Sequence, residues 1–479
     1  MAGSGDAVVG CWSLGGALVR TFATGGPVIP GARGIALGAA GEVVVTASTT
    51  GSVHRWSAAG TYLGATSIIA NSDSPSGIVF VAAPEVGGAY LVRDVHRSHA
   101  SGHSFPKYCA DVNGTLFFSA NTEAEGVELW KSDGTEAGTI LVKDIAPGAS
   151  QAHPVNLTNV NGTLFFRASD DVNVQPVHGA ELWKSDGTEA GTVLVKDIVP
   201  GSGTSAAENL TNVNGTLFFT ADDGVNGREL WKSDGTEAGT VLVKDIVSGS
   251  GTSTPGNLCN VNGTLFFAAD DGVNGRELWK SDGTAAGTVL VKNIWVAWLG
   301  SNPANLTNVS GTLFLTADDG LNGVELWKSN GTEAGTVLVK DIQPSLPASS
   351  PAGLAGVNGT LFFTADDGVN GRELWKSDGT ATGTVLVKDI RAGASSSGSG
   401  SLTSVNGTLF FTADDGVNGR ELWKSDGTAA GTVMVKNIVA GSGTSTPDKL
   451  RNVNGTLFFT ANDSVNGAEL WKSDGTAAG

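Results

Sequence analysis

The sequence predicts an all-β fold assembled from eight repeated units, and three observations lead to this prediction. The octapeptide ELWKSDGT recurs along the chain, with Asn330 replacing the aspartate in one copy. Consecutive copies lie 48 residues apart after a first interval of 53, and a fixed period of this size is typical of repeat architectures. No window has the apolar spacing of three and four that an amphipathic helix requires. The tryptophans of the copies are Trp130, Trp183, Trp231, Trp279, Trp327, Trp375, Trp423 and Trp471.

Each unit resolves into four short strands, which we name A to D. In the third copy, residues 210–213 and 216–221 are joined by Asn-Gly, a strong hairpin signal because both turn residues adopt positive φ. Residues 229–233 and 241–246 form the next two runs, bounded by Gly and Asp turn residues. Four antiparallel strands in about 40–50 residues are typical of a propeller blade. We therefore expect a β-propeller of eight four-stranded blades.

The two ends of the repeat array suggest how the ring closes. The last copy ends after its third strand, whereas residues 88–95, before the first copy, align with the fourth strand at 239–246. Pairing of residues 88–95 with the last blade would close the ring and remove an open sheet edge. The alternative is that the chain is a piece of a longer array. We assign residues 88–479 to the propeller.

Residues 1–87 lack the 48-residue unit but contain four short extended runs with Gly-rich turns. This segment resembles one degenerate blade of the NHL-repeat propellers. It is expected either to form part of a second propeller or to add irregular strands to the first. The predicted strands cover residues 34–37, 42–45, 52–56 and 60–63.

The composition favours some partners over others. Lys plus Arg number 29 against 47 Asp plus Glu, a net charge of -18 that disfavours nucleic acid and favours cations or basic surfaces. No run of 18 apolar residues is present, so no transmembrane segment is expected. Three cysteines, Cys11, Cys109 and Cys259, do not suggest a disulfide framework. The first 25 residues lack the pattern of a signal peptide.

The longer string ELWKSDGTEAGTVLVKDI, at residues 181–198 and 229–246, resembles the bacterial ELWxxDGT repeat family. The copies cover about four fifths of the chain. The resemblance implies propeller-like repeats in extracellular proteins, some of them described as hyalin-like, with no established enzymatic activity. An extracellular or cell-surface location is therefore expected.

The loop between strands B and C is a candidate calcium site. Copies three to seven read Asp-Asp-Gly-(Val or Leu)-Asn-Gly, and clustered oxygen ligands beside a sharp Gly turn suit Ca²⁺. Ordinary turn chemistry is the alternative, because the pattern lacks the distant bidentate Glu of an EF-hand. Calcium is the cofactor that this loop pattern suggests. The candidate ligands are Asp222, Asp223, Asn226, Asp270, Asp271, Asn274, Asp318, Asp319, Asn322, Asp366, Asp367, Asn370, Asp414, Asp415 and Asn418.

Strand reversal places the B–C loops and the D–A connectors on one face, which we call the variable face because it carries most differences between copies. Trp295 and Trp298 interrupt one connector there and are candidates to bind a protein or glycan. Five histidines in one sector, with Glu123 and Glu125, are candidates for a transition-metal site, although their spacing is not diagnostic. The histidines are His96, His99, His103, His153 and His178.

Two function classes remain open from the sequence. The repeated Asp, Lys and Glu offer no nucleophile paired with a base, so we expect a non-catalytic binding or structural module, for example in calcium-dependent adhesion. A metal-dependent enzyme that uses the histidine sector is the alternative. The Leu and Trp of the repeated ELW are expected to be core residues.

Overall fold

The computed structural model describes six strands within residues 1–67, and residues 104–479 except 171–177, 297–298, 345–347, 466 and 478–479. The chain divides into two units, Met1–Leu91 and Val92–Gly479. In the first unit, β1 (Val8–Trp12) pairs with β2 (Leu18–Ala23). Four further strands form an antiparallel sheet: β3 (Ala32–Leu37), β4 (Val43–Ala47), β5 (Ser52–Trp56) and β6 (Tyr62–Ser67).

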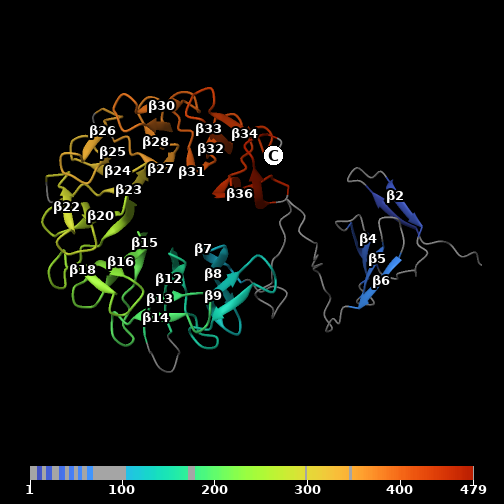
Figure 1. Cartoon of the computed structure of the whole chain (residues 1–479). Helices are drawn as coiled ribbons and strands as arrows, with labels where there is room; N and C mark the ends of the chain where they lie inside the picture. The colour runs from blue at the N-terminus through green and yellow to red at the C-terminus, as the bar shows by residue number, and fades with distance from the viewer. Residues whose placement is uncertain are drawn as a thin grey trace, which may run out of the picture. The chain divides into compact units, whose positions relative to one another are not determined.

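The second unit is an eight-bladed β-propeller of antiparallel sheets, as predicted (Figure 1). Blade 1 contains β7 (Lys107–Val112), β8 (Thr115–Thr122), β9 (Gly126–Ser132) and β10 (Ile140–Lys143). Blade 2 contains β11 (Val155–Val160), β12 (Thr163–Ala168), β13 (Glu181–Ser185) and β14 (Val193–Lys196). Blade 3 contains β15 (Glu208–Val213), β16 (Thr216–Asp222), β17 (Arg228–Ser233) and β18 (Val241–Lys244). Blade 4 contains β19 (Gly256–Val261), β20 (Thr264–Asp270), β21 (Arg276–Ser281) and β22 (Val289–Lys292).

The remaining blades repeat this order. Blade 5 contains β23 (Ala304–Val309), β24 (Thr312–Asp318), β25 (Val324–Ser329) and β26 (Val337–Lys340). Blade 6 contains β27 (Ala352–Val357), β28 (Thr360–Asp366), β29 (Arg372–Ser377) and β30 (Val385–Lys388). Blade 7 contains β31 (Gly400–Val405), β32 (Thr408–Asp414), β33 (Arg420–Ser425) and β34 (Val433–Lys436). Blade 8 contains β35 (Asp448–Val453), β36 (Thr456–Asn462) and β37 (Ala468–Ser473).

The first strand of each blade lies on the inner side of the ring, and the inner strands of consecutive blades are neighbours (Figure 1). The hairpin between β15 and β16 turns at Asn214 and Gly215, whose φ angles are 50° and 86°. This geometry confirms the predicted Asn-Gly turns and explains the repeated Asn-Gly-Thr tripeptides. The fourth strand, β18, ends at Lys244 rather than at residue 246. It stops early because the Ile246 amide bonds to the side chain of Glu229 instead of a neighbouring strand.

The hydrophobic core lies between consecutive blades. One cluster joins Phe165 and Leu182 of blade 2 to Leu217, Phe219 and Trp231 of blade 3, and equivalent clusters recur around the ring. The repeated tryptophans from Trp130 to Trp423 are 5–6% exposed. The prediction that Leu and Trp of ELW are core residues is therefore confirmed for blades 1 to 7.

Polar side chains also connect each blade to the next. Lys184 Nζ donates to the Gly235 carbonyl at 2.8 Å, and Lys244 Nζ donates to the Thr288 carbonyl at 2.8 Å. The Lys244 ammonium also lies 5.8 Å from the ring centroid of Trp279, a cation–π distance. The two repeated lysines therefore connect neighbouring blades of the ring.

In the SDGT turns the aspartate side chain accepts hydrogen bonds from within the turn. Asp234 Oδ1 accepts hydrogen bonds from the Thr236 amide at 2.8 Å and from Thr236 Oγ1 at 2.7 Å. Asn330 holds the equivalent turn through its own Oδ1, which accepts from the Thr332 amide at 3.0 Å. The Asp-to-Asn change in the fifth copy therefore preserves the turn.

Blade 8 has three strands among the described residues, and its outer part is exposed. Leu470 is 58% exposed and Glu469 is also exposed, whereas Leu230 and Glu229 in blade 3 are fully buried. Residues 88–95, predicted to supply the missing strand, lie outside the described residues. In blade 3, Lys232 pairs with Val241. Lys472 of blade 8 corresponds to Lys232, and Tyr90 corresponds to Val241, so closure would place Tyr90 opposite Lys472.

The closure prediction can be tested by disulfide trapping. In a cysteine-free background, Tyr90→Cys combined with Lys472→Cys is expected to form an intramolecular disulfide, because facing residues of paired strands have Cα atoms about 4.5–5.5 Å apart. Mobility on non-reducing gels measures the bond. The matched control, Val92→Cys with Lys472→Cys, is two residues out of register. Equal trapping of both pairs, or trapping only between chains, would argue against this closure.

Candidate functional site

The B–C loops and the D–A connectors lie against one another, which confirms the predicted variable face. The Asp222 amide, at the end of β16, donates to the Ser205 carbonyl of the connector entering blade 3 at 2.9 Å. The Arg228 amide donates to Thr252 Oγ1 of the connector leaving the blade at 3.2 Å. The B–C loop of blade 3 is therefore held between two connectors.

The Asp-Asp-Gly-x-Asn-Gly loops have one geometry in blades 3 to 7. Asp223 Oδ1 accepts from the Val225 amide at 2.9 Å and from the Asn226 amide at 2.7 Å. Asp223 Oδ2 accepts from Asn226 Nδ2 at 2.7 Å, and Asp222 Oδ1 accepts from the Gly224 amide at 2.8 Å. Burial acts to raise the pKa of Asp223, but these hydrogen bonds outweigh it and leave the pKa below its ordinary value.

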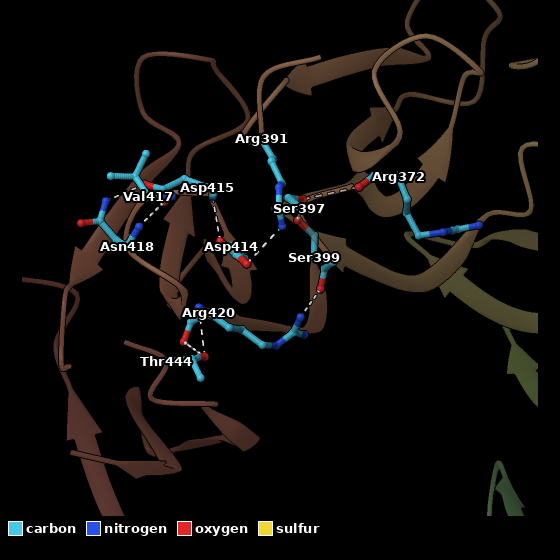
Figure 2. Close-up of polar contacts among 12 residues, drawn as sticks. Arg372, Arg391, Ser397, Ser399, Asp414, Asp415, Val417, Asn418, Arg420 and Thr444 are labelled. Carbon is cyan, nitrogen blue, oxygen red and sulfur yellow. Dashed lines mark hydrogen bonds and ion pairs between the residues drawn. The ribbon is translucent and has the colours of Figure 1, made fainter. Parts of the chain in front are cut away.

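These contacts bear on the calcium prediction, because they use carboxylate oxygens that a metal would need. Both oxygens of Asp223 bond within the loop, and the described residues contain no group of three or more His, Cys, Asp or Glu arranged to hold a metal ion. Figure 2 shows the blade 7 loop, where Asp415 meets Val417 and Asn418 in the same way. There, Arg391 Nη1 also lies 3.2 Å from Asp414 Oδ2.

Calcium binding by these loops therefore stays a prediction, which thermal melting and calorimetry can test. If the loops are ligands, millimolar Ca²⁺ should raise the melting temperature relative to EDTA, since a ligand that binds only the folded state stabilises it. Calorimetric titration should then give several sites per chain. We expect blade 7 to bind more weakly than blade 3, because Arg391 neutralises Asp414. Absence of heat and of a melting shift would leave the loops as turns alone.

The histidine sector is described only in part. His96, His99 and His103 lie outside the described residues. His178 donates its backbone amide to Asp170 Oδ1, and its Nδ1 lies 2.9 Å from Asp170 Oδ2. Glu125 bonds to Thr122 of its own loop. The described contacts of His178 and Glu125 are thus local, within their own blades.

The connector between blades 4 and 5 contains Trp295 and Trp298, which interrupt the repeat. The Trp295 amide donates to Glu277 Oε1 at 3.1 Å, and its half-buried indole lies over Gly320, where an added Cβ would come within 2.5 Å of the ring. Trp298, the second predicted ligand-binding residue, lies outside the described residues. Val296 beside Trp295 is 85% exposed.

Blade 5 differs from its neighbours in charge as well. In blades 3, 4, 6 and 7, an arginine at the start of the third strand donates to a carbonyl of the connector entering its own blade; Figure 2 includes Arg372 and Arg420. Blade 5 has Val324 at this position. Its loop keeps Asp318 and Asp319 and presents Leu321, which is 79% exposed. We call Trp295, Val296, Leu299 and Leu321 the blade-5 patch.

The structure also shows a buried carboxyl group that sequence reasoning did not single out, the Glu of ELW. Glu229 is fully buried and accepts from the amides of Ile246, Val247 and Ser253 and from Ser253 Oγ. Desolvation raises the pKa of Glu229, while these donors act to lower it. The sequence signal for this contact was a serine that recurs 24 residues after the Glu of ELW. Equivalent buried residues are Glu128, Glu181, Glu277, Glu325, Glu373 and Glu421.

The geometry assigns these glutamates to the fold. Each binds the connector that leaves its own blade, so the carboxyl group ties the variable face to the sheet. The described donors are backbone amides and, except at Glu128, a serine hydroxyl. Each carboxyl is fully buried, so it is out of reach of a substrate. The buried glutamates therefore position the loops on which a binding surface would stand.

Comparisons with known proteins found matches among solved structures only. No protein-family model matches the chain, and no curated protein matches it. Among solved structures, a prolyl endopeptidase is 14% identical over 74% of this chain and 54% of its own, with a TM-score of 0.41. The β-propeller domain of the Trilobed protease from Pyrococcus furiosus, which has an open velcro topology, is 9% identical over 78% of this chain and 96% of its own, with a TM-score of 0.37.

A virginiamycin B lyase from Staphylococcus aureus is 14% identical over 70% of this chain and 91% of its own, with a TM-score of 0.31. The chain spans just over half the length of the peptidases that it matches. Likenesses at these identities concern the fold and carry no activity to this chain.

Proposed function

We propose that the chain is a non-catalytic binding propeller of the ELWxxDGT type, carried by an extracellular or cell-surface protein, and that the blade-5 patch holds a protein partner. The observation that carries the proposal is the local break in symmetry. Val296 and Leu299 are exposed in the connector that enters blade 5, and Leu321 is exposed in the B–C loop against which this connector packs through Trp295. Blade 5 also lacks the arginine found in blades 3, 4, 6 and 7. Exposed apolar side chains gathered at one place are typical of interaction surfaces.

The charge of the patch indicates the class of partner. Asp318 and Asp319 lie in the same loop as Leu321, and the chain as a whole carries -18. A partner segment with apolar and basic side chains would match both the apolar contacts and the sign of the field. The apolar contacts would supply affinity, and the charges would supply speed of association and dependence on salt.

A labelled amphipathic peptide of lysine and leucine tests this proposal. Fluorescence anisotropy should show binding that weakens with added salt. The double variant Trp295→Ala, Leu321→Asn is expected to bind about tenfold or more weakly, as loss of a buried apolar anchor costs about 1–2 kcal/mol or more.

The matched control is Val369→Asn. Val369 is the blade 6 counterpart of Leu321 and is 69% exposed, but it stands in a blade that keeps its arginine, Arg372. It should leave the affinity unchanged. Equal weakening by both variants would indicate attraction to the acidic ring in general, and no binding to the native chain would contradict the proposal.

A further inference from the structure

The face opposite the variable face carries a repeated crevice between consecutive blades. It is formed by the A–B turn of one blade and the C–D turn of the next. Between blades 2 and 3 its lining includes Asn161, Thr163, Phe165, Lys184 and Asp234, and it encloses about 220 Å³. Equivalent cavities of about 110 Å³ lie between blades 6 and 7 and between blades 7 and 8. We call each of these an inter-blade crevice.

The floor of the crevice is apolar and tightly packed. The edge of the Phe165 ring meets Gly235, where a Cβ atom would stand 3.2 Å from Cζ. Gly235 has a φ of 89° and belongs to the SDGT turn. The absence of a side chain at Gly235 therefore opens the crevice as well as permitting the turn.

The walls of the crevice offer polar groups with spare capacity. Lys184 Nζ uses one of its three N–H donors on the Gly235 carbonyl. Asp234 engages Oδ1 with Thr236, and among the described contacts Oδ2 takes no hydrogen bond. Among those contacts the Thr163 hydroxyl makes no hydrogen bond. The Asn161 carboxamide is exposed, whereas its counterparts Asn358 and Asn406 donate Nδ2 to the carbonyls of Gly407 and Gly455 at 3.1 and 2.8 Å and keep only Oδ1 for a ligand. A ligand can therefore meet a cation, a carboxylate, a hydroxyl and an amide within one small cavity.

Charge and size then limit the ligand. One lysine and one aspartate balance each other, so the crevice does not favour an ion of either sign. A volume of about 110–220 Å³ holds several waters at about 30 Å³ each but is smaller than the roughly 300–1,000 Å³ of a drug-sized site. A neutral ring that bears several hydroxyl groups fits this combination of size, donors and acceptors.

We propose that the inter-blade crevices bind neutral sugar residues, so that the ring presents an array of equivalent weak sites to a polysaccharide. This inference deepens the proposed binding function by naming a ligand class on a second face. Many weak sites on one rigid ring would raise the apparent affinity for a sugar-coated surface by about 10²–10⁴ over that for the free sugar.

The copies are not all equivalent, which provides internal comparisons. The crevice between blades 4 and 5 has Asn330 in place of the aspartate, and the crevice between blades 5 and 6 has Ser310 in place of the asparagine. We expect these two crevices to bind sugar more weakly than that between blades 2 and 3, because Asn330 replaces the carboxylate acceptor by a neutral amide and Ser310 replaces the carboxamide by a shorter hydroxyl.

The test uses the full chain and albumin conjugates that display mannose, galactose or N-acetylglucosamine. Binding to one conjugate, competed by the same free monosaccharide at millimolar concentration, is expected. Native mass spectrometry with that monosaccharide should show several sugars bound per chain. Failure of all three conjugates to bind would overturn the inference.

A hydroxyl-deletion variant separates sugar binding from folding. It combines five isosteric changes of threonines at the crevice position: Thr163→Val, Thr216→Val, Thr264→Val, Thr360→Val and Thr408→Val. Loss of one hydrogen bond per site should weaken monosaccharide binding by about 2–12-fold with little change in melting temperature. Undiminished binding by this variant would place the sugar elsewhere and contradict the inference.

The two proposals fail separately. The Trp295→Ala, Leu321→Asn variant should bind the sugar conjugate normally, and the hydroxyl-deletion variant should bind the lysine–leucine peptide normally. If the peptide binds and the sugars do not, only the crevice inference is lost. If the sugars bind and the peptide does not, only the blade-5 patch is lost.

Discussion

Replacement of Glu229 by alanine is expected to destabilise the propeller by about 3–5 kcal/mol, because it leaves several buried hydrogen-bond donors without an acceptor. The carboxylate accepts from the amides of Ile246, Val247 and Ser253 at 3.3, 3.4 and 3.0 Å. Without it, these donors have no replacement in the buried site, and each unsatisfied donor costs about 1–3 kcal/mol. The same change leaves a cavity between sheet and connector.

Urea denaturation followed by tryptophan fluorescence measures the loss. Repeat proteins can unfold in parts, so hydrogen exchange at the Ile246 and Ser253 amides should also be measured. We expect these amides to lose protection first. Glu237→Ala is the matched control, since it removes an exposed carboxylate from the same blade. A similar loss from Glu237→Ala would show that net charge, rather than the buried contacts, sets the effect.

Glu229 illustrates what the sequence could and could not predict. The strands, the hairpin turns and the core tryptophans follow from local sequence patterns. These are the 48-residue period, the Asn-Gly dipeptides at the turns and the apolar pattern of the strands. The burial of Glu229 does not, because a charged residue beside Leu and Trp is ordinarily expected on the solvent side of a strand. Its partners stand 17 to 24 residues later. Only the path of the connector brings them together.

The candidate sites show the same division between local and distant contacts. Asp223 and Asn226 lie within four residues of each other, so their contact could be predicted from the sequence as part of a turn. The inter-blade crevice was not predicted, because Asn161 and Asp234 are in different blades and meet only when the ring is assembled. The break in the repeat at Trp295 is visible in the sequence and marks this connector as a candidate site. The position of Trp295 over Gly320 is seen only in the structure.

Raising the pH from 4.5 to 8 is expected to destabilise blade 1 through Glu128. Desolvation raises the pKa of Glu128 to about 8, against the lowering effect of the amides of Ile145, Ala152 and Ala146. The folded chain therefore holds a proton that the unfolded chain has already lost. The stability from this proton is fully present below about pH 4.5 and is lost as the pH rises through 8. At about 1.36 kcal/mol per pKa unit, the loss approaches roughly 5 kcal/mol.

A single added hydroxyl should reduce this pH dependence. Blade 2 has Ser205, whose Oγ donates to Glu181 Oε2 at 2.6 Å, at the position that Ala152 occupies in blade 1. Ala152→Ser should supply the same donor, favour the ionised carboxylate and lower the pKa of Glu128. Urea midpoints of the native and variant chains should then coincide near pH 5 and diverge by pH 8, with the variant more stable. Parallel curves across this range would mean that Glu128 is ionised throughout, with its three amide donors outweighing its desolvation.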